Sequence, residues 1–97
     1  MKVYISGPMS GLPEYNFPAF FRAADAIRQQ GDEPINPAEG APEGWTWEQY
    51  MRRALRMLLD ADAVVMLPGW QQSQGARLEY VIAQQLGMPT TFLEDGR

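Results

Sequence analysis

Short apolar runs alternate along the chain with longer segments whose apolar residues recur at helical spacing. The runs at Lys2–Ser6 and residues 63–67 are rich in β-branched residues and stop at Gly-Pro or Pro-Gly, which is typical of buried strands that end in loops. Weaker runs of the same kind cover residues 33–36 and 89–93. The pattern therefore predicts four strands.

Three amphipathic segments lie between these strands and predict helices. We expect the first to be capped by Asn16 and to end at Gly31. The second spans residues 46–59 and opens with T-x-x-Q, the spacing of a capping box. The third begins at Ser73 or Gly75. Its apolar face is predicted to consist of Leu78, Val81, Ile82 and Leu86.

Strands that alternate with helices predict an α/β fold, here a small doubly wound parallel sheet of four or five strands with flanking helices, Rossmann- or flavodoxin-like. The 97 residues accommodate one domain, residues 1–97. In such a sheet the ligand binds beyond the carboxyl ends of the strands, where the strand order reverses. The segments expected at that edge are residues 7–15, 36–46 and 68–74 and the C-terminal tail.

The composition limits the kinds of catalytic and metal sites that the protein can contain. The sequence has no Cys and no His, which excludes disulfides, Cys-built zinc sites and His-dependent triads. We therefore expect no metal and no cofactor, with carboxylates, hydroxyls, amides and backbone groups carrying any catalysis. The net charge of −4, without a basic block, predicts that no nucleic acid polymer is a partner.

The sequence also predicts a cytoplasmic protein with no membrane partner. No apolar run approaches the ~18–20 residues of a membrane span. The apolar run at the amino end is interrupted too early for a signal peptide.

The loop after the first strand is one candidate binding segment. It consists of Gly7, Pro8, Met9, Ser10 and Gly11. Glycines let a backbone approach a ligand closely, and the loop amides can face an anion. The loop matches neither GxGxxG nor GxxxxGK[ST], so a classical dinucleotide or nucleoside triphosphate site is not predicted. The alternative is a plain strand-to-helix turn.

A second candidate segment spans residues 67–79, where a strand leads through a polar loop into a helix. Free N–H groups at the helix start, together with the Ser73 hydroxyl, predict an anion site. Glu79 lies four residues past Gly75, so both can share one face of the helix. The alternative for Glu79 is a solvated residue near the start of the helix.

Further candidates lie at strand and helix ends. Asn36 is expected either to contact ligand or to form only an Asx turn. Trp70 and Trp45 are better candidates for stacking on a base than Trp47, which is expected to pack within its helix. A solvated helix face is predicted for Arg52, Arg53 and Arg56, with the alternative that one of them reaches the site.

The motifs VYISGP (residues 3–8), DAVV (62–65) and SQG-x3-E (73–79) resemble those of the nucleoside 2-deoxyribosyltransferase superfamily. This superfamily includes the 2′-deoxynucleoside 5′-phosphate N-hydrolases. The chain is most similar to its short, often phage-encoded members, which begin KVYISGPMSG and carry LPGW-x-x-S-x-G-A-R-x-E. The resemblance covers nearly the whole chain.

The resemblance implies roles for individual residues. Glu79 matches the glutamate that attacks the anomeric carbon of the sugar, and Tyr4 matches a strand tyrosine that holds this carboxylate. Residues 7–11 match the segment that lines the sugar and phosphate. Ser73 stands where transferases of free nucleosides carry an aspartate that would repel a phosphate. The implied activity is therefore N-glycosidic cleavage of a nucleoside 5′-monophosphate.

Two departures from the family pattern leave alternatives open. Ala54 stands where the enzymes usually place an aspartate near the sugar hydroxyls. Pro8 and Ser10 stand where the phosphate-reading hydrolases offer serine and arginine. The alternatives are base exchange, as in a nucleoside 2-deoxyribosyltransferase, and a catalytically inactive nucleotide-binding module.

We also expect a homodimer or a higher homo-oligomer. Relatives complete the sugar pocket with a residue from a neighbouring subunit, so the resemblance implies assembly. The short chain and the bulky apolar residues of the second helix favour the same conclusion.

Overall fold

The computed structural model describes residues 1–93 and has the predicted α/β architecture. The strands are β1 (Lys2–Ser6), β2 (Glu33–Ile35), β3 (Ala63–Met66) and β4 (Thr90–Phe92). They form one sheet in the order β2-β1-β3-β4, and every pairing is parallel. The predicted fold class is confirmed, with four strands in residues 1–93.

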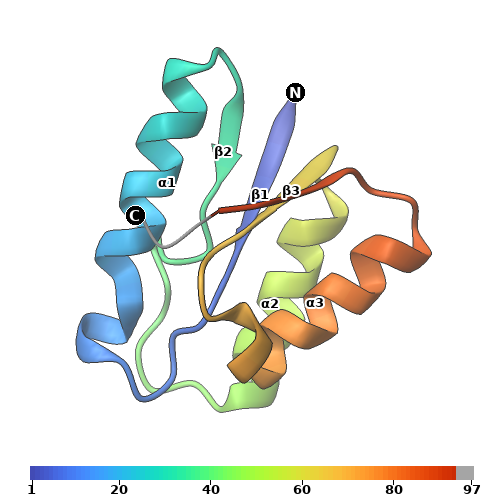
Figure 1. The fold of residues 1–97 in the computed structure, drawn as a ribbon. Helices are drawn as coiled ribbons and strands as arrows, with labels where there is room; N and C mark the ends of the chain where they lie inside the picture. Colours follow the sequence, from blue (N-terminus) through green and yellow to red (C-terminus); the bar gives the residue numbers. More distant parts are fainter. Residues whose placement is uncertain (94–97) are drawn as a thin grey trace.

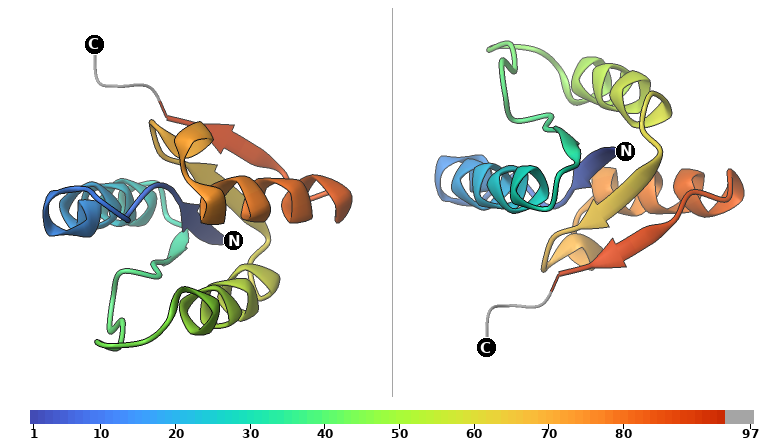
Figure 2. Two further views of the ribbon diagram at one scale, coloured as in Figure 1. Left: turned by 90° about the horizontal axis from the view of Figure 1, so that it is seen from below. Right: turned by 90° about the horizontal axis from the view of Figure 1, so that it is seen from above.

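Helices cover both faces of this sheet (Figures 1 and 2). Helix α1 (Phe17–Gln29) lies on one face, and α2 (Trp47–Leu59) and α3 (Gln74–Gln85) lie on the other. Two short 3-10 helices, η1 (Pro13–Asn16) and η2 (Trp70–Gln72), precede α1 and α3. Because β2 and β3 flank β1 on opposite sides, the strand order reverses between β1 and β3. The switch point of the sheet therefore lies between the ends of these two strands.

Each face of the sheet has its own apolar core, because side chains alternate along a strand. The core beneath α1 contains Val3, Ile5, Phe20, Ala24 and Leu67. The core beneath α2 and α3 contains Tyr4, Leu58, Val64, Met66 and Ala83. Strand β1 therefore sends Tyr4 towards α2 and α3.

The capping-box pattern in the sequence predicts the start of α2 correctly. The backbone N–H of Gln49 donates to Thr46 Oγ1, and the backbone N–H of Thr46 donates to Gln49 Oε1, which completes the predicted capping box. Asn16 is the N-cap residue of α1, as predicted, but its side chain makes no capping hydrogen bond. Its φ of 61° is left-handed rather than the extended backbone of a capping side chain, and its Nδ2 donates instead to the carbonyl oxygen of Pro8 at 3.0 Å.

Asn16 is the last of three consecutive non-glycine residues in the left-handed region. Glu14 and Tyr15 have φ values of 53° and 52°. The three form most of η1, which has no buried residue. The Asn16–Pro8 hydrogen bond ties this left-handed turn to the loop after β1.

The apolar face predicted for α3 is wrong for three of its four residues, whereas Ile82 packs against the core as predicted. Leu78, Val81 and Leu86 are exposed. The residues buried against the sheet are instead Ala76, Glu79 and Ala83. The helix is rotated so that a carboxylate and two small side chains face β1 and β3, and this rotation leaves larger apolar side chains in solvent.

Residues 1–93 contain no helix that is long and apolar enough to cross a membrane. The same residues contain no group of three or more His, Cys, Asp or Glu side chains placed to hold a metal ion. The C-terminal tail, which the sequence places at the ligand-binding edge, falls on residues 94–97, outside the described part of the chain.

Candidate functional site

A buried carboxylate lies between α3 and β1. This carboxylate is that of Glu79, a residue that is only 5% exposed. Tyr4 Oη donates to its Oε2 at 2.5 Å, and Ser6 Oγ donates to its Oε1 at 2.6 Å. Residues 4 and 6 are two apart on β1, so their side chains point to the same face. Each carboxylate oxygen therefore has a hydroxyl donor of its own.

Burial raises the pKa of Glu79 from 4.5 to about 7, against the hydrogen bonds from Ser6 and Tyr4, which lower it. Burial also raises the pKa of Tyr4 well above 10, and the charge of Glu79 raises it further, whereas Arg53 lowers it. Near neutral pH, Glu79 is therefore present in both protonation states while Tyr4 remains a neutral donor. Carboxyl groups poised in this way are concentrated at functional sites.

A cleft of about 770 Å³ lies between the loop after β1 and the loop after β3. This is the switch point of the sheet, the place where doubly wound folds bind ligands. The cleft is lined by residues 8–10, Leu12, Asn16, Trp47, residues 68–69 and residues 71–75.

Gly75 connects the cleft to the buried carboxylate. It lines the cleft and lies one helical turn before Glu79 on the same face of α3. Helical side chains lean towards the helix N-terminus, so the carboxylate of Glu79 extends back towards Gly75. A Cβ at position 75 would lie 2.9 Å from Met51 Sδ, so glycine lets α2 pack against this end of α3. Glu79 itself does not line the cleft formed by the described residues; it lies one helical turn further along α3 than Gly75.

Ser73 places the positive end of α3 at the cleft. Its Oγ accepts a hydrogen bond from the backbone N–H of Ala76 at 3.1 Å, so it is the N-cap of the helix. Gln74 and Gly75, in the first turn, also line the cleft. The helix dipole and the free N–H groups of this turn favour an anion there.

Five of the predicted binding residues therefore line the cleft: Pro8, Met9, Ser10, Ser73 and Gly75. The other four, which are Gly7, Gly11, Asn36 and Trp70, lie outside its lining among the described residues. A Cβ on Gly7 would lie 2.7 Å from the Cβ of Leu67, so this glycine lets the first loop pass close to the end of β3. The ring of Trp70 packs on Tyr80 and Phe92, with centroids 4.7 and 5.7 Å away.

Trp47, rather than Trp70 or Trp45, is the tryptophan that lines the cleft. The sequence assigns it to helix packing because it continues the apolar face of α2. It occupies the first turn of a helix that follows a parallel strand, and this turn lies at the carboxyl edge of the sheet. Trp45 packs instead against Tyr50, with ring centroids 5.8 Å apart.

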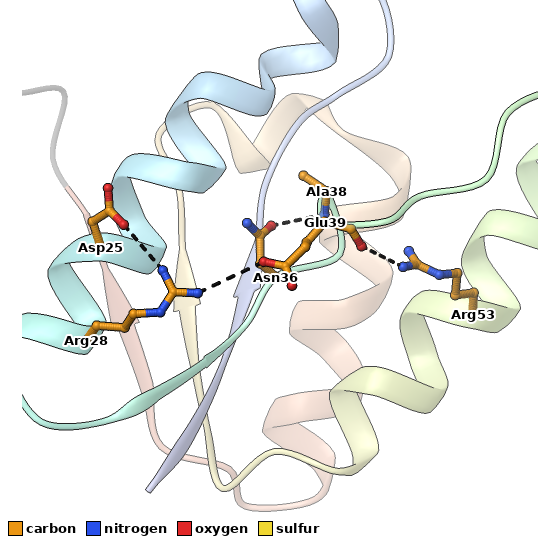
Figure 3. Close-up of polar contacts among 6 residues, drawn as sticks. All are labelled: Asp25, Arg28, Asn36, Ala38, Glu39 and Arg53. Carbon is orange, nitrogen blue, oxygen red and sulfur yellow. Dashed lines mark hydrogen bonds and ion pairs between the residues drawn. The ribbon is translucent and has the colours of Figure 1, made fainter.

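Asn36 forms the Asx turn that the sequence allows. Its Oδ1 accepts from the backbone N–H two residues on at 3.0 Å, and its buried Nδ2 has no partner among the described residues (Figure 3). The prediction that Arg53 lies on a solvated face is wrong. Its guanidinium donates to the carbonyl oxygens of Pro37 and Glu39 at 2.9 and 3.0 Å, while Arg28 of α1 approaches the Glu39 carboxylate at 4.0 Å. Both helices therefore hold the loop after β2.

Besides Trp47, sequence reasoning missed Ser6. The available signal is its spacing from Tyr4, since a second hydroxyl on the same face of a buried strand needs a polar partner. The partner could not be identified, because it lies 73 residues further along the chain.

The fold and the site define a doubly wound α/β domain with a switch-point cleft above a hydroxyl-bonded glutamate. Residues 1–92 match the family described as a domain of unknown function, DUF4406, and the chain belongs to that family. A search of the curated proteins finds no match.

Two solved structures share the fold. The 2-deoxyribosyltransferase from Bacillus psychrosaccharolyticus has a TM-score of 0.74 and 19% identity, over 95% of this chain and 71% of that enzyme. The 2-desoxiribosyltransferase from Leishmania mexicana has a TM-score of 0.73 and 17% identity, over 95% of this chain and 63% of that one. At these identities the likeness establishes the fold.

The raised pKa of Glu79 predicts a pH-dependent stability. The folded protein binds this proton more tightly (pKa about 7) than a free glutamate does (4.5), so the free energy of unfolding falls as pH rises between these values. The contribution lost is about 3 kcal/mol. Glu79→Gln, which stays neutral, should therefore resist urea better than the wild type at pH 8 and resemble it at pH 4.

The matched control is Glu48→Gln, which removes a charge from an exposed position in the first turn of α2. Urea unfolding followed by circular dichroism at both pH values gives the comparison. If the free energies of unfolding of Glu79→Gln and wild type differ by the same amount at pH 4 and pH 8, the raised pKa of Glu79 does not make stability depend on pH.

Proposed function

We propose that this protein cleaves the N-glycosidic bond of a nucleoside 5′-monophosphate, with Glu79 as the nucleophile. The observation that carries the proposal is the glutamate held by Tyr4 and Ser6 beneath the switch-point cleft. A carboxylate that contacts the anomeric carbon can stabilise the positive charge that develops there and trap it covalently. The shared fold with two enzymes described as deoxyribosyltransferases supports the same class of bond chemistry.

The proposed reaction has two steps. A lone pair of Glu79 forms a bond to the anomeric carbon while the carbon–nitrogen bond breaks, and the released electron pair leaves with the base, which takes a proton from water. A second water molecule then attacks the anomeric carbon, loses a proton to solvent and displaces the carboxylate. The products are free base and sugar phosphate. The reaction uses no metal or cofactor.

Features of the cleft support a nucleotide as the ligand. Ser73 and the first turn of α3 offer an anion site for the phosphate. The indole of Trp47 offers an apolar surface for the base. In this proposal Met9 and Ser10 contact the sugar phosphate from the opposite wall.

Two other functions have specific support. Base exchange is favoured by the two enzymes of shared fold, and it predicts that a second base accelerates turnover and appears in the product. An inactive nucleotide-binding module is favoured by Ala54 and by the burial of Glu79, and it predicts binding in calorimetry without release of base. Incubation with ribo- and deoxyribonucleoside monophosphates and modified pyrimidines, with chromatography for free base, separates the three functions.

Glu79→Gln should abolish base release and preserve the fold. The amide keeps the size and polarity of the side chain, replaces one acceptor oxygen with an NH2 donor, and lacks the negative charge. Chromatographic assays should show less than about a tenth of the wild-type kcat, an increase in barrier of at least about 1.4 kcal/mol. Glu48→Gln, in the exposed first turn of α2, is the control. A larger residual activity would exclude Glu79 as the nucleophile.

Ser73→Asp should weaken binding of monophosphates far more than binding of free nucleosides. Aspartate is as good an N-cap as serine, so α3 should keep its start. The added charge would repel the phosphate at the cleft wall. Calorimetry with a nucleotide and its nucleoside provides the comparison. Equal losses for both ligands would show that Ser73 does not read phosphate.

We further propose that the protein assembles as a homodimer or higher homo-oligomer through the layer formed by α2 and α3. Apolar side chains exposed on these helices include Trp47, Leu59, Leu78 and Val81. Light scattering at micromolar concentration should therefore give at least twice the chain mass of 11.0 kDa.

Val81→Lys should shift this assembly towards monomer, because it places a charge in the apolar surface. Gln29→Lys adds the same charge on α1, across the sheet, and should leave the mass unchanged. A wild-type protein that is monomeric and still releases base would contradict this assembly and the expectation that a neighbouring subunit completes the sugar pocket.

A further inference from the structure

The two oxygens of Glu79 have different surroundings. Tyr4, which holds Oε2, lies within β1 in the core beneath α2 and α3, and both Tyr4 and Ser6 are 1% exposed. Ser6, which holds Oε1, is the last residue of β1. A strand rises about 3.3 Å per residue, so Ser6 lies about 7 Å nearer than Tyr4 to the carboxyl edge of the sheet.

The carboxyl edge is also the edge of the cleft. Pro8, two residues after Ser6, lines the cleft, as does Gly75, towards which the Glu79 side chain extends. The space beside Gly75 is occupied by Met51 and Trp47 of α2, so α2 closes this side of the first turn of α3. Oε1 is therefore the oxygen on the cleft side, and Oε2 is the oxygen on the core side.

We infer that Oε1 is the attacking oxygen of Glu79 and that Ser6 is a positioning residue which holds this oxygen towards the anomeric carbon. The inference rests on the proposed function. The serine hydroxyl donates one hydrogen bond and can rotate about its Cβ–Oγ bond, so it can stay on the ionised oxygen until the new carbon–oxygen bond forms. Tyr4 keeps Oε2 fixed throughout, because its ring is enclosed by the core.

The ionisation of Glu79 supports this role. Burial favours the protonated carboxyl, and the Ser6 hydrogen bond is the largest influence that opposes it, ahead of the bond from Tyr4. A hydrogen bond to the charged form of a carboxyl favours that form. Ser6 therefore supplies a charged nucleophile as well as an oriented one.

The experiment compares Ser6→Ala, Ser6→Thr and Tyr4→Phe, with Thr91→Val as a control that removes a hydroxyl from the exposed position 91 of β4. Carbon-13 NMR of glutamate-labelled protein follows the titration of the Glu79 carboxyl, which Glu79→Gln assigns. This readout needs no substrate and no activity. Base release is measured in parallel from pH 5 to pH 9.

We expect Ser6→Ala to raise the proton affinity of Glu79 about tenfold, one pKa unit, and Thr91→Val to leave it unchanged. The kcat of Ser6→Ala should fall most below pH 7 and remain about tenfold low at pH 9, with KM unchanged, because the oxygen is then charged but no longer held. Ser6→Thr, which keeps the hydroxyl, should restore both properties. Tyr4→Phe should recover more of its kcat than Ser6→Ala at pH 9.

An unchanged Glu79 titration in Ser6→Ala would overturn the role of Ser6 while leaving the proposed function intact. Full recovery of kcat in Ser6→Ala at pH 9, or an equal loss in Tyr4→Phe there, would overturn the assignment of Oε1. If Ser6→Ala does not fold, the same two criteria apply to Ser6→Cys, whose thiol is a weaker donor. Absence of base release from the wild type would overturn the proposed function, and the attacking oxygen with it, even if the titration behaves as expected.

Discussion

The burial of one carboxylate against two hydroxyls is the constraint on which the rest of this small fold depends. An ionised carboxylate without partners costs several kcal/mol in a protein interior, so Glu79 has to face Tyr4 and Ser6. This requirement sets the rotation of α3 about its own axis. Leu78 and Val81 then face solvent, although a helix packed for stability alone would bury them. The orientation of α3 thus buries the carboxylate of Glu79 together with Ala76 and Ala83, at the expense of the larger side chains of Leu78 and Val81.

The features predicted correctly from the sequence are those set by neighbouring residues. The apolar runs of β1 and β3 and the capping box of α2 depend on a few adjacent side chains, and each is found where expected. Alternation of strands with helices was sufficient for the fold class, because parallel strands need crossover connections. The position of the cleft followed from the same order of elements.

The features that sequence reasoning missed depend on contacts between distant segments. The role of Ser6 depends on its hydrogen bond to Glu79. The role of Arg53 depends on its hydrogen bonds to carbonyl groups in the loop after β2. A helical pattern cannot distinguish an arginine in solvent from one that binds a loop. The same limit applies to Trp47, whose place at the cleft depends on where α2 begins relative to the sheet.

The left-handed turn at residues 14–16 has a consequence for the energetics of recognition. A left-handed backbone costs roughly 1–2 kcal/mol for each residue with a side chain, and this turn has three such residues and buries none. This backbone strain therefore lowers the stability of the fold, and no core packing within the turn offsets it. What it provides is order: Leu12 and Asn16 hold their places in the cleft before any ligand arrives. A ligand that contacts this rim need not arrange it, so part of the entropy normally lost in association has already been lost in folding. Glycines in the turn would relieve the strain, but they would also make the turn more flexible, so that a ligand would have to order it on binding.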